Sequence, residues 1–250
     1  MDPFLEKRLV EVQKRIASRV CLDDSFSEEM PAGVDQAFLG ELVASGAVVL
    51  DQSLKIRKAS GCALKAAMPY VPGFLSFREG AAAVKAVRGL DPEPSLLFVD
   101  GCGINHPRRA GLACFVGVLL DLPTVGITKS VLCGNFDQPE KEDDAEPLIH
   151  EGDVVGYILS SKKGCRPIAV APGHRITIDS ALEATRRCLR GRKLPEPCRL
   201  AHEQAGQIKA ALSPGPEASL STPAPRQTRP DRFWRSHDGM ARGPQRDCAP

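Results

Sequence analysis

The sequence lacks the features that mark membrane, secreted and zinc-binding proteins. No apolar run approaches the ~18 residues that a membrane span requires, and residues 1–20 mix charges among their apolar positions, unlike a signal peptide. The nine cysteines include no Cys-x-x-Cys pair and no zinc-ligand spacing, which indicates reduced thiols inside a cell. We therefore expect a cytoplasmic protein that does not associate with membranes.

The sequence also lacks an excess of charge of either sign. Its 33 basic and 31 acidic residues give a net charge of +2. Residues 214–250 hold six arginines and four acids, so the preceding residues balance 27 against 27. Overall charge would not attract a polyanion, and any nucleic-acid site must be local.

Length and composition predict one globular domain and a tail. The chain has 250 residues, 42% of them hydrophobic, enough for a full core. Seven of its 21 prolines fall in residues 214–250, where periodicity is also weak. We predict a monomeric globular domain at 1–212 and a disordered, proline-rich tail at 213–250. Phe233 and Trp234 in that tail could be a peptide ligand, an aromatic contact for single-stranded nucleic acid, or residues without an essential role.

Hydrophobic periodicity predicts a mixed α/β fold. We expect a first amphipathic helix that packs through Leu5, Leu9, Val12 and Ile16, followed by strands at 31–38, 42–50 and 54–67 and a stiff loop at 68–73. Helices at 74–90 and 111–120 should then alternate with strands at 96–99 and 124–129, before an acidic, poorly periodic segment at 135–151 with a solvated loop at 140–144. The chain should continue with a hairpin of 153–160 and 166–171, a helix capped by Asp179 or Ser180, and a last helix at 197–212. A meander followed by alternating helices and strands suggests a ribonuclease-H-like mixed central sheet flanked by helices.

The stretch LLFVDGCGINHPRRAG, residues 96–111, is central to this pattern. Its apolar start is typical of a buried parallel strand that carries Asp100 to its carboxyl end, where ligands bind in open α/β sheets. Gly101 and Gly103 allow a sharp turn and close approach. His106 and the two following arginines suit contact with a phosphate, so His106 is a candidate substrate-binding residue. The alternative is an ordinary strand followed by a polar turn.

Three acids stand where predicted strands or helices begin or end: Asp35, Glu79 and Asp100. No local spacing rule connects them, and only a fold that pairs the first and fourth strands would bring them together. Converging carboxylates repel unless a cation binds, and hard oxygen ligands suit Mg²⁺. Each acid also has an ordinary alternative, as a satisfied strand residue, a helix first-turn charge and a turn residue.

Six separate motifs then resemble one family. GVDQAF, MPYVPGFLSFRE, FVDGCGINHPRRAG, VGITKS, APGHR and LPEPCRLAH occur in the order seen in endonuclease V, across roughly residues 5–212. The resemblance implies a ribonuclease-H-like fold and an endonuclease dependent on Mg²⁺, with Mn²⁺ as a substitute, that acts in DNA repair. Its substrate would be inosine in DNA or, for some members, in RNA. It would cut the second phosphodiester 3′ to the deaminated base and leave 3′-hydroxyl and 5′-phosphate ends.

The resemblance also implies roles for individual residues. Asp35, Glu79 and Asp100 would bind metal and act in catalysis, His202 would orient the attacking water, and Lys129 would contact the scissile phosphate. Lys129 could instead be a surface cation.

Two further groups of residues match the family's recognition elements. Pro69, Tyr70, Val71 and Pro72 match a wedge that enters the duplex at the lesion, and Gly73, Leu75, Gly101, Gly111 and Leu132 match its pocket for the displaced base. Cys102, Gln36 and Asn105 depart from commoner family residues, and Cys102 could alter hydrogen bonding at the pocket edge.

Three other interpretations remain open. The chain could be a related nuclease of another specificity, such as one that cuts flaps or junctions. It could bind inosine without cutting, although the retained acids argue against this. It could also act through its tail, in which case deletion of residues 213–250 would remove function.

Overall fold

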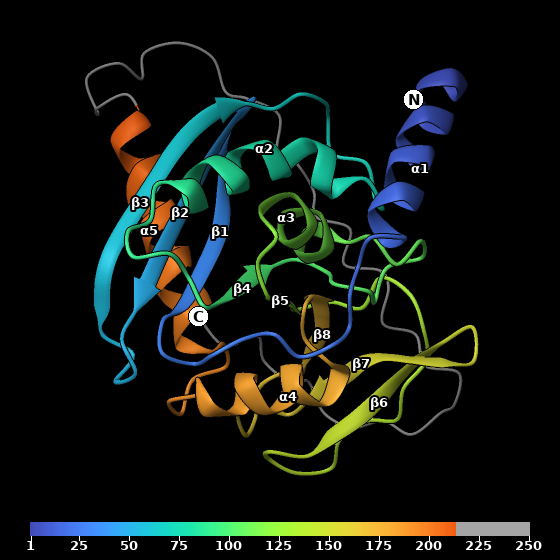
Figure 1. Ribbon diagram of the computed structural model, residues 1–250, viewed down its shortest axis with the longest axis vertical. Helices are drawn as coiled ribbons and strands as arrows, with labels where there is room; N and C mark the ends of the chain where they lie inside the picture. Colours follow the sequence, from blue (N-terminus) through green and yellow to red (C-terminus); the bar gives the residue numbers. More distant parts are fainter. Residues whose placement is uncertain (214–250) are drawn as a thin grey trace.

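The computed structural model describes residues 1–213 of the chain (Figure 1). The predicted disordered tail, including Phe233 and Trp234, lies outside the described residues. The helices are α1 (Pro3–Ala17), α2 (Leu75–Arg88), α3 (Leu112–Leu120), α4 (Ile178–Arg187) and α5 (Glu196–Leu212). The strands are β1 (Pro31–Leu39), β2 (Leu42–Leu50), β3 (Ile56–Lys65), β4 (Leu96–Asp100), β5 (Thr124–Thr128), β6 (Ala145–His150), β7 (Asp153–Leu159) and β8 (Ile168–His174). Within residues 1–213, none of the helices has the length and apolarity needed to cross a bilayer.

The strands form one mixed sheet in the order β3-β2-β1-β4-β5-β8-β7-β6. β1, β4 and β5 are parallel to one another, and the other neighbouring pairs are antiparallel. Val34 of β1 lies opposite Val99 of β4. Asp35 and Asp100 are the next residues of these two strands, so the parallel pairing brings both acids to the same end of the sheet. The predicted mixed sheet flanked by helices is confirmed.

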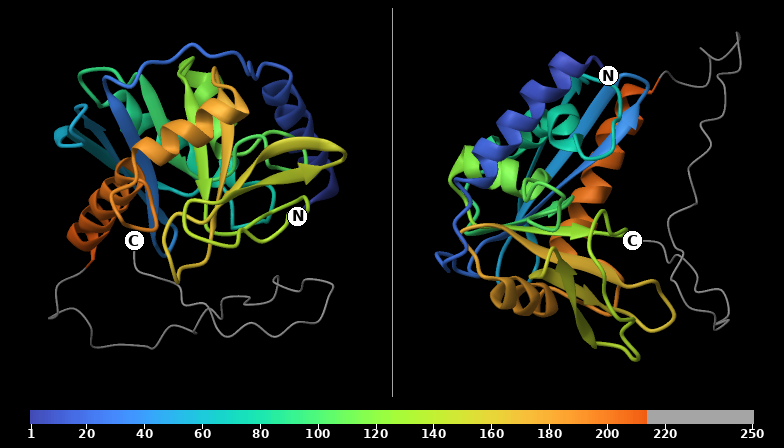
Figure 2. Two further views of the ribbon diagram at one scale, coloured as in Figure 1. Left: turned by 90° about the horizontal axis from the view of Figure 1, so that it is seen from below. Right: turned by 90° about the vertical axis from the view of Figure 1, so that its right-hand side faces the viewer.

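Helices cover both faces of the sheet, and the alternating side chains of β4 show which helix lies on which side. Leu97 and Val99 pack in a buried cluster with α2 and α3. Leu96 and Phe98 point to the opposite face and pack in a second cluster with α4 and the start of α5. Because successive strand residues point to opposite faces, a short apolar run can support two layers at once. Figure 2 (right) shows the strands between α1 and α2 on one side and α5 on the other.

Helix α5 approaches the sheet unusually closely, at glycines. A Cβ on Gly33 would overlap the backbone carbonyl of Pro197, and one on Gly46 would lie 2.8 Å from the backbone carbon of Gln204. The absence of side chains at these positions therefore lets the backbone of α5 rest directly on β1 and β2. This contact places the residues of α5 relative to Asp35 on the same face.

The structure corrects three local predictions. The acidic segment at 135–151 contains the strand β6, whose antiparallel pairing with β7 overrides a weak local pattern that includes Pro147. Helix α1 forms as predicted, but Leu5 and Val12 are exposed, and the helix instead buries Gln13 and Ile16. The N-cap of α4 is Thr177, whose side chain accepts a hydrogen bond from the backbone of Ser180.

Candidate active site

Three carboxylates lie near one another where the parallel pairing of β1 with β4 ends. Asp35 and Glu79 are each only 5% exposed, and the side chain of Asp100 is 26% exposed. Asp35 and Asp100 come from neighbouring parallel strands, and Glu79 comes from the second turn of α2. Although they lie 44 and 21 residues apart in sequence, the fold brings the three acids close enough for the charges of Asp100 and Asp35 to act on Glu79.

Burial and neighbouring negative charges raise the pKa values of Glu79 and Asp100. Burial is the largest cause, and together with the negative charges of Asp100 and Asp35 it raises the pKa of Glu79 to about 8. Burial also raises the pKa of Asp100, as does the charge of Asp35, while Lys129 and His202 oppose the shift. Near neutral pH, these carboxylates therefore cannot all be ionised at low cost without an additional positive charge.

Two basic side chains border the acids. His202 of α5 lies with its Nδ1 2.6 Å from Oδ2 of Asp35. This hydrogen bond is the main reason that the pKa of His202 is raised. Lys129 directly follows β5, and its Nζ lies 3.7 Å from Oδ2 of Asp100. The side chains of His202 and Lys129 are 44% and 42% exposed, so both can reach a ligand from the solvent side.

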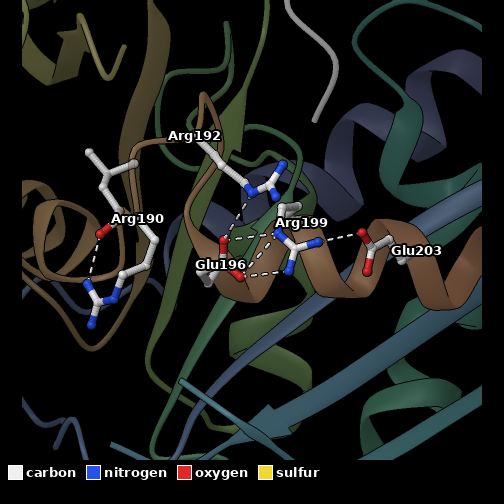
Figure 3. Close-up of polar contacts among 6 residues, drawn as sticks. Arg190, Arg192, Glu196, Arg199 and Glu203 are labelled. Carbon is white, nitrogen blue, oxygen red and sulfur yellow. Dashed lines mark hydrogen bonds and ion pairs between the residues drawn. The ribbon is translucent and has the colours of Figure 1, made fainter. Parts of the chain in front are cut away.

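The first turns of α5 are fixed by a polar cluster one turn before His202 (Figure 3). Arg199 donates to both carboxylate oxygens of Glu196, with its Nε 2.9 Å from Oε1 and its Nη2 2.7 Å from Oε2. It also bonds Glu203, and Arg192 approaches Glu196 at 3.9 Å. Glu196 and Arg199 are only 11% and 14% exposed in their side chains, so this bidentate pair is a more persistent contact than an ordinary surface ion pair.

A pocket of about 260 Å³ adjoins the acids. All five predicted pocket residues line it: Gly73, Leu75, Gly101, Gly111 and Leu132. Tyr70 and His106 line it too, and Asp100 and Lys129 belong both to its wall and to the cluster of acids. A group held in this pocket would thus lie next to two of the predicted catalytic residues. The remaining ones (Asp35, Glu79 and His202) do not line it.

The predicted wedge is a loop with an exposed ring. Tyr70 is 63% exposed and is the only residue of the four from Pro69 to Pro72 that lines the pocket. Gly73 follows with a φ of +78°, a conformation that favours glycine. The other two pocket glycines have a different structural reason. A Cβ on Gly111 would overlap the backbone carbonyl of Cys102, and a Cβ on Gly101 would lie 2.9 Å from the Cβ of Leu112. These glycines therefore let the protein's own loop close on itself.

Sequence reasoning did not find every residue of this pocket. Ser76, Thr128, Ser130 and Val131 also line it. Three of these follow or end β5, next to Lys129. The rule that ligands bind beyond the carboxyl ends of parallel strands could have identified them.

The residues fit a divalent cation in charge and atom type. They offer carboxylate oxygens, and the raised pKa values of Glu79 and Asp100 reflect burial and, after it, repulsion between negative charges, which a cation would relieve. However, no three His, Cys, Asp or Glu side chains among residues 1–213 are already gathered as a ligand cluster. Both oxygens of Asp35 are engaged, with the backbone N–H of Gln36 and with His202. The carboxylates would therefore have to move closer together to hold an ion.

The fold and this site define an α/β enzyme whose acids come from two parallel strands and a neighbouring helix. Comparison with known proteins gives the class directly, because a family model of endonuclease V matches residues 14–203. The endonuclease V of Archaeoglobus fulgidus is 42% identical over 219 residues, which cover 83% of this chain and 95% of that protein.

Solved structures agree. Endonuclease V of Streptomyces avermitilis is 33% identical with a TM-score of 0.78, over 83% of this chain and 95% of that one. Endonuclease V of Ciona intestinalis, solved with a DNA that contains an inosine, is 21% identical with a TM-score of 0.74, over 85% of this chain and 100% of that one, and shows the same fold. The chain belongs to the endonuclease V family, and it is an endonuclease that hydrolyses phosphodiester bonds.

Proposed function

We propose that this endonuclease recognises inosine in nucleic acid, depends on Mg²⁺, and hydrolyses the second phosphodiester bond 3′ to the lesion, leaving 3′-hydroxyl and 5′-phosphate ends. The observation that carries the proposal is the shared wall of the pocket and the acid cluster, formed by Asp100 and Lys129. When a base is held in the pocket, the backbone of the nucleic-acid strand that carries it would lie beside the acids. Relatives in the family support the substrate, since the Ciona protein was solved with inosine-containing DNA.

Recognition requires the base to leave its stack. Tyr70, exposed at the pocket mouth, would fill the space that the base vacates, and stacking of one aromatic ring on a base is worth ~1–3 kcal/mol. Gly73, Leu75, Gly101, Gly111 and Leu132 would surround the displaced base. His106 would contribute to the pocket wall as a substrate-binding residue.

Catalysis would use the acids and the two bordering basic residues. Asp35, Glu79 and Asp100 would hold the divalent cation, Mg²⁺ or in its place Mn²⁺, which supplies charge for activating water and for stabilising the leaving oxygen. Lys129 would contact the scissile phosphate. Asp35 accepts a hydrogen bond from Nδ1 of His202 and so orients the ring, which leaves Nε2 available to hold or pass a proton.

A cleavage assay tests the proposal. End-labelled strands with one inosine, or adenine in its place, are made as DNA and as RNA and incubated with Mg²⁺ or EDTA. We expect a single cut in the inosine strand, lost in EDTA. Asp100→Asn should slow single-turnover cleavage by about 10³-fold, as expected when several kcal/mol of transition-state stabilisation are removed. Asp137→Asn, an exposed aspartate on the loop after β5, is the matched control and should cut normally.

Each arm of the assay has a contradicting result. Equal cutting of inosine and adenine strands would contradict the role of the pocket in base recognition. Full activity in EDTA would contradict the dependence on a metal ion. Binding of the inosine strand without any cut would contradict the catalytic roles. The comparison of the two backbones decides between DNA and RNA, which differ at the 2′-hydroxyl.

A further inference from the structure

The carbonyl oxygen of Gly73 receives three side-chain donors. Nε2 of Gln13 and Nη2 of Arg108 each lie 2.8 Å from it, and Nε2 of His106 lies at 3.1 Å. Gly73 directly follows the wedge loop, residues 69–72, and lies two residues before the first residue of α2. A carbonyl oxygen has two lone pairs, so two donors would satisfy it. The third donor restricts its position further.

The donors are also bonded to one another. Nε of Arg108 donates to Oε1 of Gln13 at 2.5 Å, and the backbone N–H of Arg108 donates to Nδ1 of His106 at 3.1 Å. Since Nδ1 accepts, the ring proton of neutral His106 lies on Nε2 and points to Gly73. Burial lowers the pKa of His106 to about 4, which keeps this arrangement in place near neutral pH. The guanidinium of Arg108 lies 4.7 Å from the ring centre of Phe74 and is thereby held from a further side.

This network joins three segments that are far apart in sequence. Gln13 comes from α1, Gly73 from the end of the wedge loop, and His106 and Arg108 from the loop after β4. Gln13 is 2% exposed, and it and Ile16 are the buried residues of α1. An apolar side chain would dock α1 as well. A buried amide whose nitrogen and oxygen are both hydrogen-bonded instead specifies one geometry, because a shift would leave these atoms unpaired.

The position of Gly73 explains what such a geometry is for. Gly73 lines the pocket, as do Tyr70 on one side of it in sequence and Leu75 on the other. A displacement of the Gly73 carbonyl would therefore move the wedge ring and the pocket wall together. The Tyr70 side chain is 63% exposed and makes no hydrogen bond within residues 1–213, so hydrogen bonds at other positions hold the loop.

We propose that Gln13 is a positioning residue for lesion recognition, which acts with Arg108 through the Gly73 carbonyl to fix the wedge loop against the pocket. The inference rests on the proposed function, because it takes Tyr70 as the wedge. It assigns to α1, far from the acids in sequence, a part in selecting the substrate.

The first test substitutes Gln13 in the full chain. Gln13→Met keeps the length of the side chain and removes its hydrogen bonds, while Gln13→Glu keeps the acceptor for Arg108 and loses the donor to Gly73. Base displacement is measured with 2-aminopurine placed beside the inosine, as the rise in fluorescence on binding in EDTA, and cleavage is measured as kcat/KM in Mg²⁺. We expect both variants to lose most of the fluorescence rise and about tenfold in kcat/KM for the inosine strand. Gln207→Met, an exposed glutamine on α5, is the control.

A double-variant comparison separates positioning from general stability. If Gln13 acts through the wedge, Gln13→Met should cost little more once Tyr70→Ala has been made. A full, additive loss in the Tyr70→Ala background would overturn the proposal, as would a wild-type fluorescence rise in Gln13→Met. Arg108→Lys is the second variant if Gln13→Met does not fold. It keeps the charge but cannot bond Gln13 and Gly73 at once, and normal base displacement in it would equally contradict the inference.

The wild-type arm separates the two proposals. If the unaltered protein does not prefer inosine strands, the proposed function fails. If the wild type prefers them and Gln13→Met behaves identically, only the role of Gln13 fails.

Discussion

The two halves of the candidate site are held in different ways. The acid half comprises Asp35, Glu79, Asp100, Lys129 and His202, and the recognition half comprises the wedge loop, the pocket loops at 101–112 and 130–132, and Gln13 of α1. The acid half is built on strands and on a helix that touches the sheet backbone to backbone, yet its charges oppose one another. The recognition half is built on loops, and the buried polar groups around Gly73 are hydrogen-bonded to one another.

This difference follows from what each half has to do. Positions of groups that handle protons and phosphate must be accurate to fractions of an ångström, which rigid elements provide. The repulsion between the negative charges of the acids favours the binding of a cation. A loop that inserts into nucleic acid needs a defined resting geometry and the ability to leave it, and a network of individually modest hydrogen bonds provides both.

The largest effect should come from breaking the attachment of α5. In Gly33→Ala, the new methyl group would overlap the carbonyl of Pro197, and a backbone cannot yield as a flexible side chain can. We expect the free energy of unfolding to fall by about 3 kcal/mol, with cleavage lost as His202 shifts from Asp35. Urea unfolding and the cleavage assay measure both effects. Gly206→Ala, in the same helix where a methyl group meets nothing within 4 Å, should instead stabilise the protein by up to ~1 kcal/mol. Similar behaviour of the two variants would contradict the close-contact argument.

An intermediate effect should come from removing one charge of the acid half. Because the pKa of Glu79 in the folded protein is raised to about 8, the folded state holds the proton more tightly than the unfolded chain. Its contribution to stability is therefore complete below about pH 4.5 and is lost as the pH rises through about 8. We expect Glu79→Gln to raise the free energy of unfolding at pH 8, in EDTA, by on the order of 2 kcal/mol relative to wild type, and to differ little at pH 4.

Denaturation across this pH range, with and without Mg²⁺, measures the effect. Mg²⁺ should stabilise the wild type more than Glu79→Gln, since the cation would relieve the same repulsion. Glu93→Gln, at an exposed position, should follow the wild-type curve. Parallel curves for wild type and Glu79→Gln would show that the acids do not conflict.

The smallest effect should come from the polar cluster at the start of α5. Arg199→Ala leaves Glu196 with the more distant Arg192 as its cationic neighbour, so we expect a loss of about 1 kcal/mol in unfolding free energy. Cleavage should fall less than threefold, because the glycine contacts still place His202. Arg192→Ala, whose side chain is 55% exposed, is the control and should change neither quantity measurably. A loss in cleavage as large as that of Gly33→Ala would show that the cluster, and not the backbone contact, positions α5.

The sequence alone predicts the acid half better than the recognition half. Asp35 and Asp100 follow apolar strand residues, and one assumption, that the first and fourth strands are parallel neighbours, is enough to bring them together. Lys129 follows the next strand in the same way. These predictions succeed because the end of a parallel strand has a defined place in a sheet.

The network around Gly73 could not be predicted in this way. Gln13 stands at a helical spacing that favours apolar residues, and its partner lies 60 residues away. Nothing in the local pattern distinguishes it from a solvated glutamine, and the apolar residues Leu5 and Val12 led to the wrong face of α1. The strand β6 was missed for a related reason, since its pairing with β7 outweighs its composition.

The bond between Asp35 and His202 spans 167 residues. Protein synthesis proceeds from the N-terminus, so a growing chain has completed β1 and β4 long before α5 leaves the ribosome. The sheet can form early, but the aspartate–histidine pair cannot. An unfinished chain thus lacks the histidine that we place in catalysis, and the proposed site is complete only once α5 has been synthesised.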